Sequence, residues 1–135
     1  MSEFKLPALV RLALILVLTL PVAAFHGFVG WHKAFSSHAE LVVHKAWTMH
    51  LPAVLGKAVG WVEIALTLVL LLALAQPRFA RQGVLACGML IVLEVISLIT
   101  HQVMNDGAPP LQNVFSVAVT ALLGWLHLGR AKTMA

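Results

Sequence analysis

Four long apolar stretches occupy most of this chain, and each is long enough to cross a bilayer as an α-helix. They cover residues 6–31, 51–76, 83–102 and 111–128 of the 135. A helix satisfies its own backbone hydrogen bonds in lipid, and short links between consecutive helices give antiparallel neighbours. The sequence therefore predicts an all-α fold, a single domain in which four transmembrane helices run up, down, up and down.

The composition supports the membrane class and excludes several others. Hydrophobic residues make up 61% of the chain and charged residues 10%, whereas a soluble domain is about half apolar and about a quarter charged. The basic residues are scattered and form no recognition motif, so we expect no nucleic-acid partner. Cys87 is the only cysteine, which excludes a disulfide or a thiolate metal cluster within one chain. Its apolar neighbours predict a small buried core residue.

The first stretch has two interpretations. Lys5 and Arg11 resemble the basic start of a signal peptide, and residues 22–24 (Val-Ala-Ala) resemble a cleavage site. Apolar residues continue past that site and Arg11 interrupts the run, which favours a retained helix with a bend at Pro21.

The longest polar connection covers residues 32–50. A mixed apolar pattern over residues 39–49 predicts a short interfacial helix, with Trp47 at the level of the lipid headgroups.

The distribution of Lys and Arg predicts the topology, because cytoplasmic links carry an excess of both. Lys33 and Lys45 lie on one side of the predicted bundle. Six basic residues lie on the other: Lys5, Arg11, Arg78, Arg81, Arg130 and Lys132. We therefore expect both termini in the cytoplasm and the links 32–50 and 104–110 on the outer face.

Two apolar stretches carry a glutamate close to their middle, Glu63 in the second and Glu94 in the third. A carboxylate at mid-membrane depth is costly, so it needs a partner, a proton or a function. Counting from the ends of the stretches puts both at a similar depth, and two close carboxylates would not both stay ionised in a low dielectric.

Helical spacing predicts that each helix has one polar or small stripe facing the bundle interior. These stripes are Thr19 and His26; Gly56, Gly60, Glu63 and Thr67; Cys87, Glu94 and His101; and Asn113, Ser116, Thr120, Gly124 and His127. We expect the Gly56/Gly60 pair to allow a close helix approach. Lys57, His26 and His101 would form an outer polar layer above the two glutamates. This set is either an internal network that fixes helix register or a proton-handling or ligand pocket open to the outer face.

The chain has seven histidines, five of them at intervals of six residues. Six residues turn a helix by about 600°, so these side chains do not share a face, and the spacing is not one of metal ligands. We expect no tightly bound copper, zinc or haem. His26 and His101 are the one pair whose similar depth makes a b-type haem conceivable. His127 lies alone at the inner end, and we expect it at the interface.

Several short motifs resemble the DoxX-like family of small bacterial four-helix membrane proteins. They are residues 30–35 (GWHKAF), 55–63 (LGKAVGWVE), 77–81 (PRFAR) and 109–113 (PPLQN). The resemblance implies a bacterial inner-membrane protein, with Lys33, Gly60 and Glu63 as family-typical residues. On that ground Lys33 is a sixth candidate residue for the ligand or proton pocket, beside the five named below. Named members are linked to thiosulfate–quinone oxidation or to oxidant-defence complexes, in which they are a membrane partner.

Three hypotheses about function follow. The first is an accessory membrane subunit of a redox or quinone-linked complex, with a soluble or membrane redox partner and a pocket formed by His26, Lys57, Glu63, Glu94 and His101. In it the glutamates exchange protons and a quinone is the implied ligand. The second is a non-catalytic structural or interaction module, and the third is a small transporter or metal-handling protein. The sequence contains no catalytic motif and leaves a homo-oligomer open.

Overall fold

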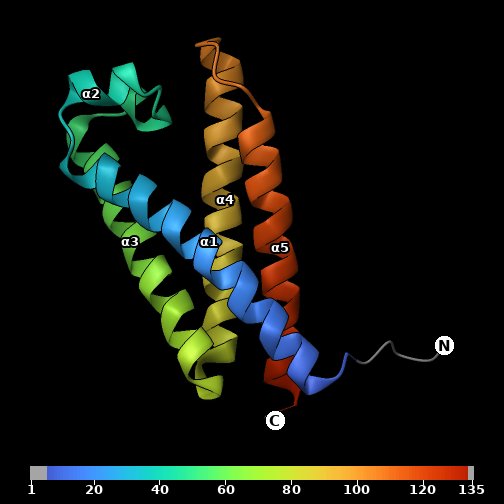
Figure 1. Cartoon of the computed structure of the whole chain (residues 1–135). Helices are drawn as coiled ribbons and strands as arrows, with labels where there is room; N and C mark the ends of the chain where they lie inside the picture. The colour runs from blue at the N-terminus through green and yellow to red at the C-terminus, as the bar shows by residue number, and fades with distance from the viewer. Residues whose placement is uncertain (1–5, 134–135) are drawn as a thin grey trace.

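The computed structural model describes residues 6–133, and every regular element within that range is a helix. Four of the helices are long and apolar enough to cross a membrane (Figure 1). They are α1 (Ala8–Phe35), α3 (Ala53–Ala75), α4 (Ala80–Met104) and α5 (Leu111–Lys132). The predicted all-α four-helix bundle is confirmed, and the chain is a multi-pass membrane protein.

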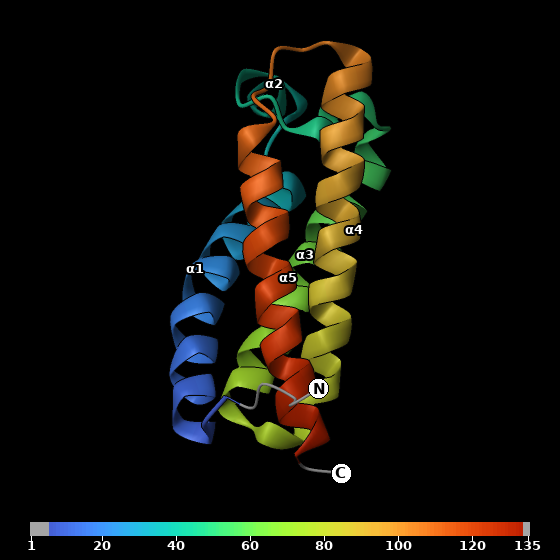
Figure 2. The same cartoon turned by 90° about the vertical axis from the view of Figure 1, so that its right-hand side faces the viewer.

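Each long helix packs against two others in the order α1–α3–α4–α5, and α5 also contacts α1. The start of α1 and the end of α5 lie at one end of the bundle, together with the short η2 (Pro77–Phe79); we call this the basal end (Figures 1 and 2). The cap end carries α2 (His38–Val43), η1 (Trp47–His50) and the turn 105–110.

Arginine side chains join the helices at the basal end. Arg11 Nη1 donates to the Gly129 carbonyl at 3.0 Å, and Arg130 Nη1 donates to the Ala73 carbonyl at 2.9 Å. Both acceptors belong to the last turn of a helix, where carbonyls lack helical partners and the dipole favours a cation. The predicted cationic side of the bundle is therefore this end, although Lys5 lies outside the described residues.

The basal half of the bundle is filled by an apolar layer of four fully buried side chains, Ile15, Leu70, Leu90 and Leu123. Cys87 belongs to the same core, as predicted, and is buried. Since all four members of the layer are aliphatic, the layer itself offers no hydrogen-bonding group that could carry water between the two ends.

α1 crosses α3 in close contact at Gly30 and Gly60. A Cβ on Gly60 would lie 2.5 Å from the Ala34 nitrogen and 2.6 Å from the Gly30 carbonyl oxygen. Only a residue without a side chain fits at this distance, as small residues at membrane helix crossings allow. The prediction of close approach holds for Gly60, whereas Gly56 faces Thr48 of η1.

α1 is inclined across the bundle and changes direction along its length (Figures 1 and 2). Pro21 lies inside this helix and has no N–H to donate to the carbonyl four residues earlier, which permits a bend. The helix is continuous through residues 22–24, so the segment after the candidate cleavage site is part of the bundle.

We call α2, η1 and the turn 105–110 together the cap. Its structure corrects one expectation from the sequence. A short helix is present in the connection, and Ser37 caps it together with Glu40 in a reciprocal pair of hydrogen bonds. Trp47 is buried in the protein, however, with only 6% of its surface exposed. Its expected place among lipid headgroups is wrong, because the cap folds back over the bundle and the Trp47 ring lies beneath it, 5.4 Å from Lys33 Nζ.

We expect Gly60→Ala to destabilise the bundle by about 1–3 kcal/mol, because the added methyl overpacks the α1–α3 crossing. Gly88→Ala is the matched control: it lies in α4, and no atom lies within 4 Å of the position that its new methyl group would take, so its effect should be neutral or slightly stabilising. Thermal unfolding in the same detergent, followed by circular dichroism, compares the two. Equal melting temperatures of the two variants would contradict the close contact between α1 and α3 at Gly60.

Candidate functional site

The predicted polar stripes face the interior of the bundle. Five of the six predicted site residues are buried: His26, Lys33, Glu63, Glu94 and His101. Lys57 is exposed on α3, and its predicted place in the pocket is wrong. It follows Gly56 by one residue, which is about 100° around the helix. Since Gly56, Gly60 and Glu63 face inward, Lys57 points away from the bundle.

The cation that pairs with Glu63 is Lys33. Lys33 Nζ lies 2.6 Å from Glu63 Oε1, and both side chains are almost fully buried. Lys33 was predicted to lie in the outer link, but α1 extends to Phe35. Thr19, His26 and Lys33 therefore follow one another every seven residues on one buried face of α1, and the Gly30/Gly60 crossing brings that face onto α3.

Glu94 is held by groups from two other helices. Asn113 of α5 donates through Nδ2 to Glu94 Oε2 at 2.8 Å and contacts Ser97 Oγ at 3.0 Å. His26 Nδ1 lies 3.8 Å from Glu94 Oε1, and His26 Nε2 lies 3.3 Å from Ser116 Oγ. His26 and Lys33 lie on the same buried face of α1, and they contact Glu94 and Glu63 respectively. This face therefore links the two glutamates, and we define the buried polar cluster as His26, Lys33, Glu63, Glu94 and Asn113.

Several buried polar atoms in and below this cluster have no hydrogen-bond partner among the described residues. They include Glu63 Oε2, His26 Nδ1 and the hydroxyl oxygens of Thr19, Thr67 and Thr120. Leaving a buried polar atom unpaired costs about 1–3 kcal/mol, so such atoms normally bind water or a ligand. The cluster therefore has bonding capacity beyond its internal pairs.

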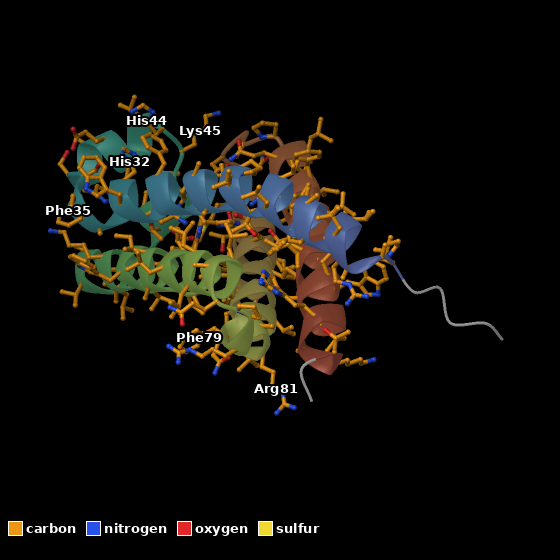
Figure 3. All side chains as sticks on the ribbon, turned by 60° about the horizontal axis from the view of Figure 1, so that its bottom comes forward. His32, Phe35, His44, Lys45, Phe79 and Arg81 are labelled. Carbon is orange, nitrogen blue, oxygen red and sulfur yellow. The ribbon has the colours of Figure 1, made fainter. Side chains whose placement is uncertain are left out.

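A cavity of about 530 Å³ lies between the buried polar cluster and the cap. Lys33, Glu94 and Asn113 line it from the bundle, and residues 44–47 line it from the cap. Its volume falls in the range of small-molecule sites. Figure 3 shows His32, His44 and Lys45 gathered beside α2, far from Phe79 and Arg81 at the basal end. Lys33 Nζ also lies 5.4 Å from the centroid of the Trp47 ring, which leaves the ammonium group at the cavity wall.

Asp106 fastens the rim of this cavity. Its Oδ2 lies 2.7 Å from His101 Nδ1 and 3.1 Å from His50 Nε2, and its Oδ1 accepts from the Ala108 N–H at 3.1 Å. Partial burial acts to raise the pKa of the Asp106 carboxyl, but the hydrogen bonds from His101, His50 and Ala108 together outweigh it and lower the pKa from 3.8 to about 2. The carboxylate thereby ties α4, η1 and the turn together.

The remaining histidines form no shared centre. The rings of His32 and His44 meet edge to face with centroids 5.0 Å apart. Among residues 6–133, no group of three or more His, Cys, Asp or Glu side chains is arranged to hold a metal ion. His127 is fully buried at the basal end, so its expected interfacial position is wrong; it packs where Gly83 leaves room on α4.

Sequence reasoning missed three residues of the site. The sequence places Asn113 on an inward stripe without a role, Asp106 within the outer link 104–110 and Trp47 at the lipid interface. The seven-residue spacing of Thr19, His26 and Lys33 is the signal that could have extended α1 and placed Lys33 inside.

Comparison with known proteins adds no relative: no family model, no curated protein and no solved structure matches this chain.

We expect Lys33→Met to destabilise the protein by about 3–5 kcal/mol, because it leaves the Glu63 carboxylate buried without its cation. Combining it with Glu63→Gln should recover part of the loss, since the double variant buries no unpaired charge. Thermal unfolding measures all three proteins, with Lys57→Met as the exposed control. A double variant that loses the sum of the two single effects would contradict a direct pair.

The lowered pKa of Asp106 predicts that the stability of the turn at the rim of the cavity depends on pH. Because the folded-state pKa is below the ordinary value of 3.8, the ionised carboxylate stabilises the turn above about pH 4, and this contribution is lost as the pH falls toward about 2. Asp106→Ala removes the acceptor of the Ala108 N–H, so it should lower the protection of this amide against hydrogen exchange at neutral pH and remove the pH dependence of that protection between about pH 4 and 2. Glu40→Gln, on α2, is the control and should leave the protection of Ala108 unchanged. Equal protection of the Ala108 amide in wild type and Asp106→Ala would refute the role of Asp106 in holding the turn.

Proposed function

We propose that this protein is an accessory membrane subunit of a redox or quinone-linked complex, and that its cavity receives the oxygen-bearing headgroup of a quinone. The observation that carries the proposal is the donor-rich cavity of about 530 Å³ above a buried carboxylate. Lys33 has N–H donors beyond the one that it gives to Glu63 and can offer them to a carbonyl oxygen. Asn113 holds the Glu94 carboxylate at the cavity, and Glu94 and His26 can hold a proton beside it. The short motifs that resemble the DoxX-like family support the same assignment.

The buried polar cluster suits proton exchange better than it suits covalent chemistry. Reduction of a quinone to a quinol takes up two electrons and two protons, and the electrons would come from the partner in the complex. Within the chain, His26 of α1 is hydrogen-bonded through Nε2 to Ser116 of α5, and its Nδ1 lies 3.8 Å from Glu94 Oε1 of α4, just beyond hydrogen-bond distance. An imidazole and a carboxyl group this close are suited to exchange a proton at the wall of the cavity.

The orientation proposed for this subunit places the cap on the outer face of a bacterial inner membrane. The basal end carries Arg11, Arg78, Arg81, Arg130 and Lys132, which favours the cytoplasmic side for that end. In this orientation the cavity opens toward the outer face. The apolar layer separates it from the cytoplasmic side, which makes a through-going transporter the less suitable assignment.

A structural module is the second candidate, because the Lys33–Glu63 pair sits directly at the Gly30/Gly60 crossing. Polar pairs at helix crossings can fix register without binding anything. The two candidates differ in one measurable property, which is whether the cavity binds a headgroup.

A tailless benzoquinone tests the proposal in detergent-solubilised protein. Trp31, Trp61 and Trp125 are exposed and are replaced by Phe, which leaves Trp47 at the cavity as the fluorescent reporter. We expect saturable quenching of Trp47, with affinity about tenfold weaker in Asn113→Ala, because that change removes the hydrogen bond that holds the Glu94 carboxylate at the cavity. Lys57→Met should bind as the parent does.

A second variant keeps the test independent of folding. His44→Ala removes an exposed ring from the cavity wall and leaves the buried polar cluster intact, and it should weaken quenching without lowering the melting temperature. Linear, unsaturated quenching that is the same in all variants would reject the headgroup site and favour the structural module.

A further inference from the structure

A second cavity lies beside the first on the lipid-facing side of the bundle. It has a volume of about 450 Å³ and is a groove between α1 and α5. Its walls are almost entirely apolar, and several of them, such as Val17 and Phe115, are strongly exposed. In a membrane this exposure faces acyl chains rather than water. We call it the α1–α5 groove.

The groove and the polar cavity share part of their lining. Phe25 and Gln112 contribute to both, so one side of each residue faces the apolar space and the other faces the polar one. Ser116 lines the groove and lies 3.3 Å from His26 Nε2, while the Phe25 ring meets the His26 ring edge to face at 5.1 Å. The lining therefore changes from apolar in the groove to polar in the cavity within a single helix turn.

We propose that the ligand of the cavity is a single-tailed amphiphile, whose headgroup lies in the polar cavity and whose tail lies in the α1–α5 groove. The nature of the headgroup rests on the proposed function. The new part of this proposal is the tail and its path along the α1–α5 groove. A fully water-soluble ligand would leave the groove unused, and a plain hydrocarbon would leave the donors of the cavity unpaired. Only a molecule with a polar headgroup and an apolar tail matches both the polar cavity and the adjoining apolar groove.

The position of the groove also sets the direction of access. Pro21 and Val17 lie one helix turn apart on α1 and both line it, so the segment of α1 that lacks a backbone hydrogen bond borders the opening to lipid. The tail would run along Val17, Pro21 and Val119 toward the basal end. The ligand then reaches the cavity sideways from the bilayer, passing Phe25 and Gln112.

The basal end provides an internal control. A third cavity of about 440 Å³, lined by residues that include Leu85 and Leu128, also faces away from the core. None of its lining residues belongs to the polar cavity. Arg81 and Lys132 also line this third cavity, and its other lining residues are apolar. Ordinary lipid tails should therefore reach both grooves, whereas the tail of a headgroup-anchored ligand should occupy only the α1–α5 groove.

The experiment uses a decyl-tailed benzoquinone that carries a photoreactive diazirine at the tail end. The full chain in nanodiscs is irradiated with this probe, and labelled peptides are mapped by mass spectrometry. We expect labelling to concentrate on residues 17–22 and 115–119, and excess unlabelled decyl-tailed benzoquinone should suppress it several-fold. Equal labelling of the basal groove at Leu85 and Leu128, without competition, would overturn the proposal and identify the occupant as ordinary lipid.

A groove-filling variant gives an independent readout. Val17→Phe should block the groove, and Leu20→Phe is the control, because Leu20 is an exposed α1 residue outside it. The change at Val17 should lower about tenfold the labelling that excess unlabelled compound suppresses, and it should leave binding of the tailless benzoquinone unchanged. The change at Leu20 should alter neither quantity. If the tailless compound binds but labelling is uniform, only the tail assignment is wrong. If the tailless compound does not bind, the proposed function itself fails.

Discussion

The ion pair between Lys33 and Glu63, set directly at the Gly30/Gly60 crossing, is the contact on which the rest of the site depends. A charged pair at this depth is stable only when both groups are held close and shielded from lipid. Two glycines provide that distance, because a single added methyl would collide with the opposite backbone. The crossing also positions His26 beside Glu94, since His26 lies two turns before Lys33 on the same face of α1.

The two halves of the bundle have different chemistry. Toward the cap, carboxylates, histidines and an amide surround a cavity, and some of their polar atoms have no partner in the described part of the protein. Toward the basal end, the apolar layer closes the interior and arginines bind the ends of the helices. This arrangement, with a cavity at one end and an apolar layer at the other, fits the proposed headgroup site better than it fits a pore.

The cap makes the site a cavity instead of an open cleft. Trp47 extends over Lys33, while Asp106 joins η1 to α4 and to the α4–α5 turn. The contact between His50 and Asp106 spans more than fifty positions in the chain, so it constrains two links that are otherwise independent. On the side facing α1 and α5 the polar lining adjoins a groove open to lipid.

The sequence alone determined the membrane class, the four helices and the faces they bury, because hydropathy and helical spacing depend only on neighbouring residues. It correctly placed Glu63, Glu94 and His101 inside. It could not pair Glu63 with Lys33 rather than Lys57, because that choice depends on how far α1 extends and on the angle at which it crosses α3. The same holds for Asn113, Asp106 and Trp47, whose partners are distant in the chain. Contacts between residues so distant in the chain are decided by the tertiary packing. Here the crossing of α1 and α3 at Gly30 and Gly60 determines which of the buried polar side chains meet.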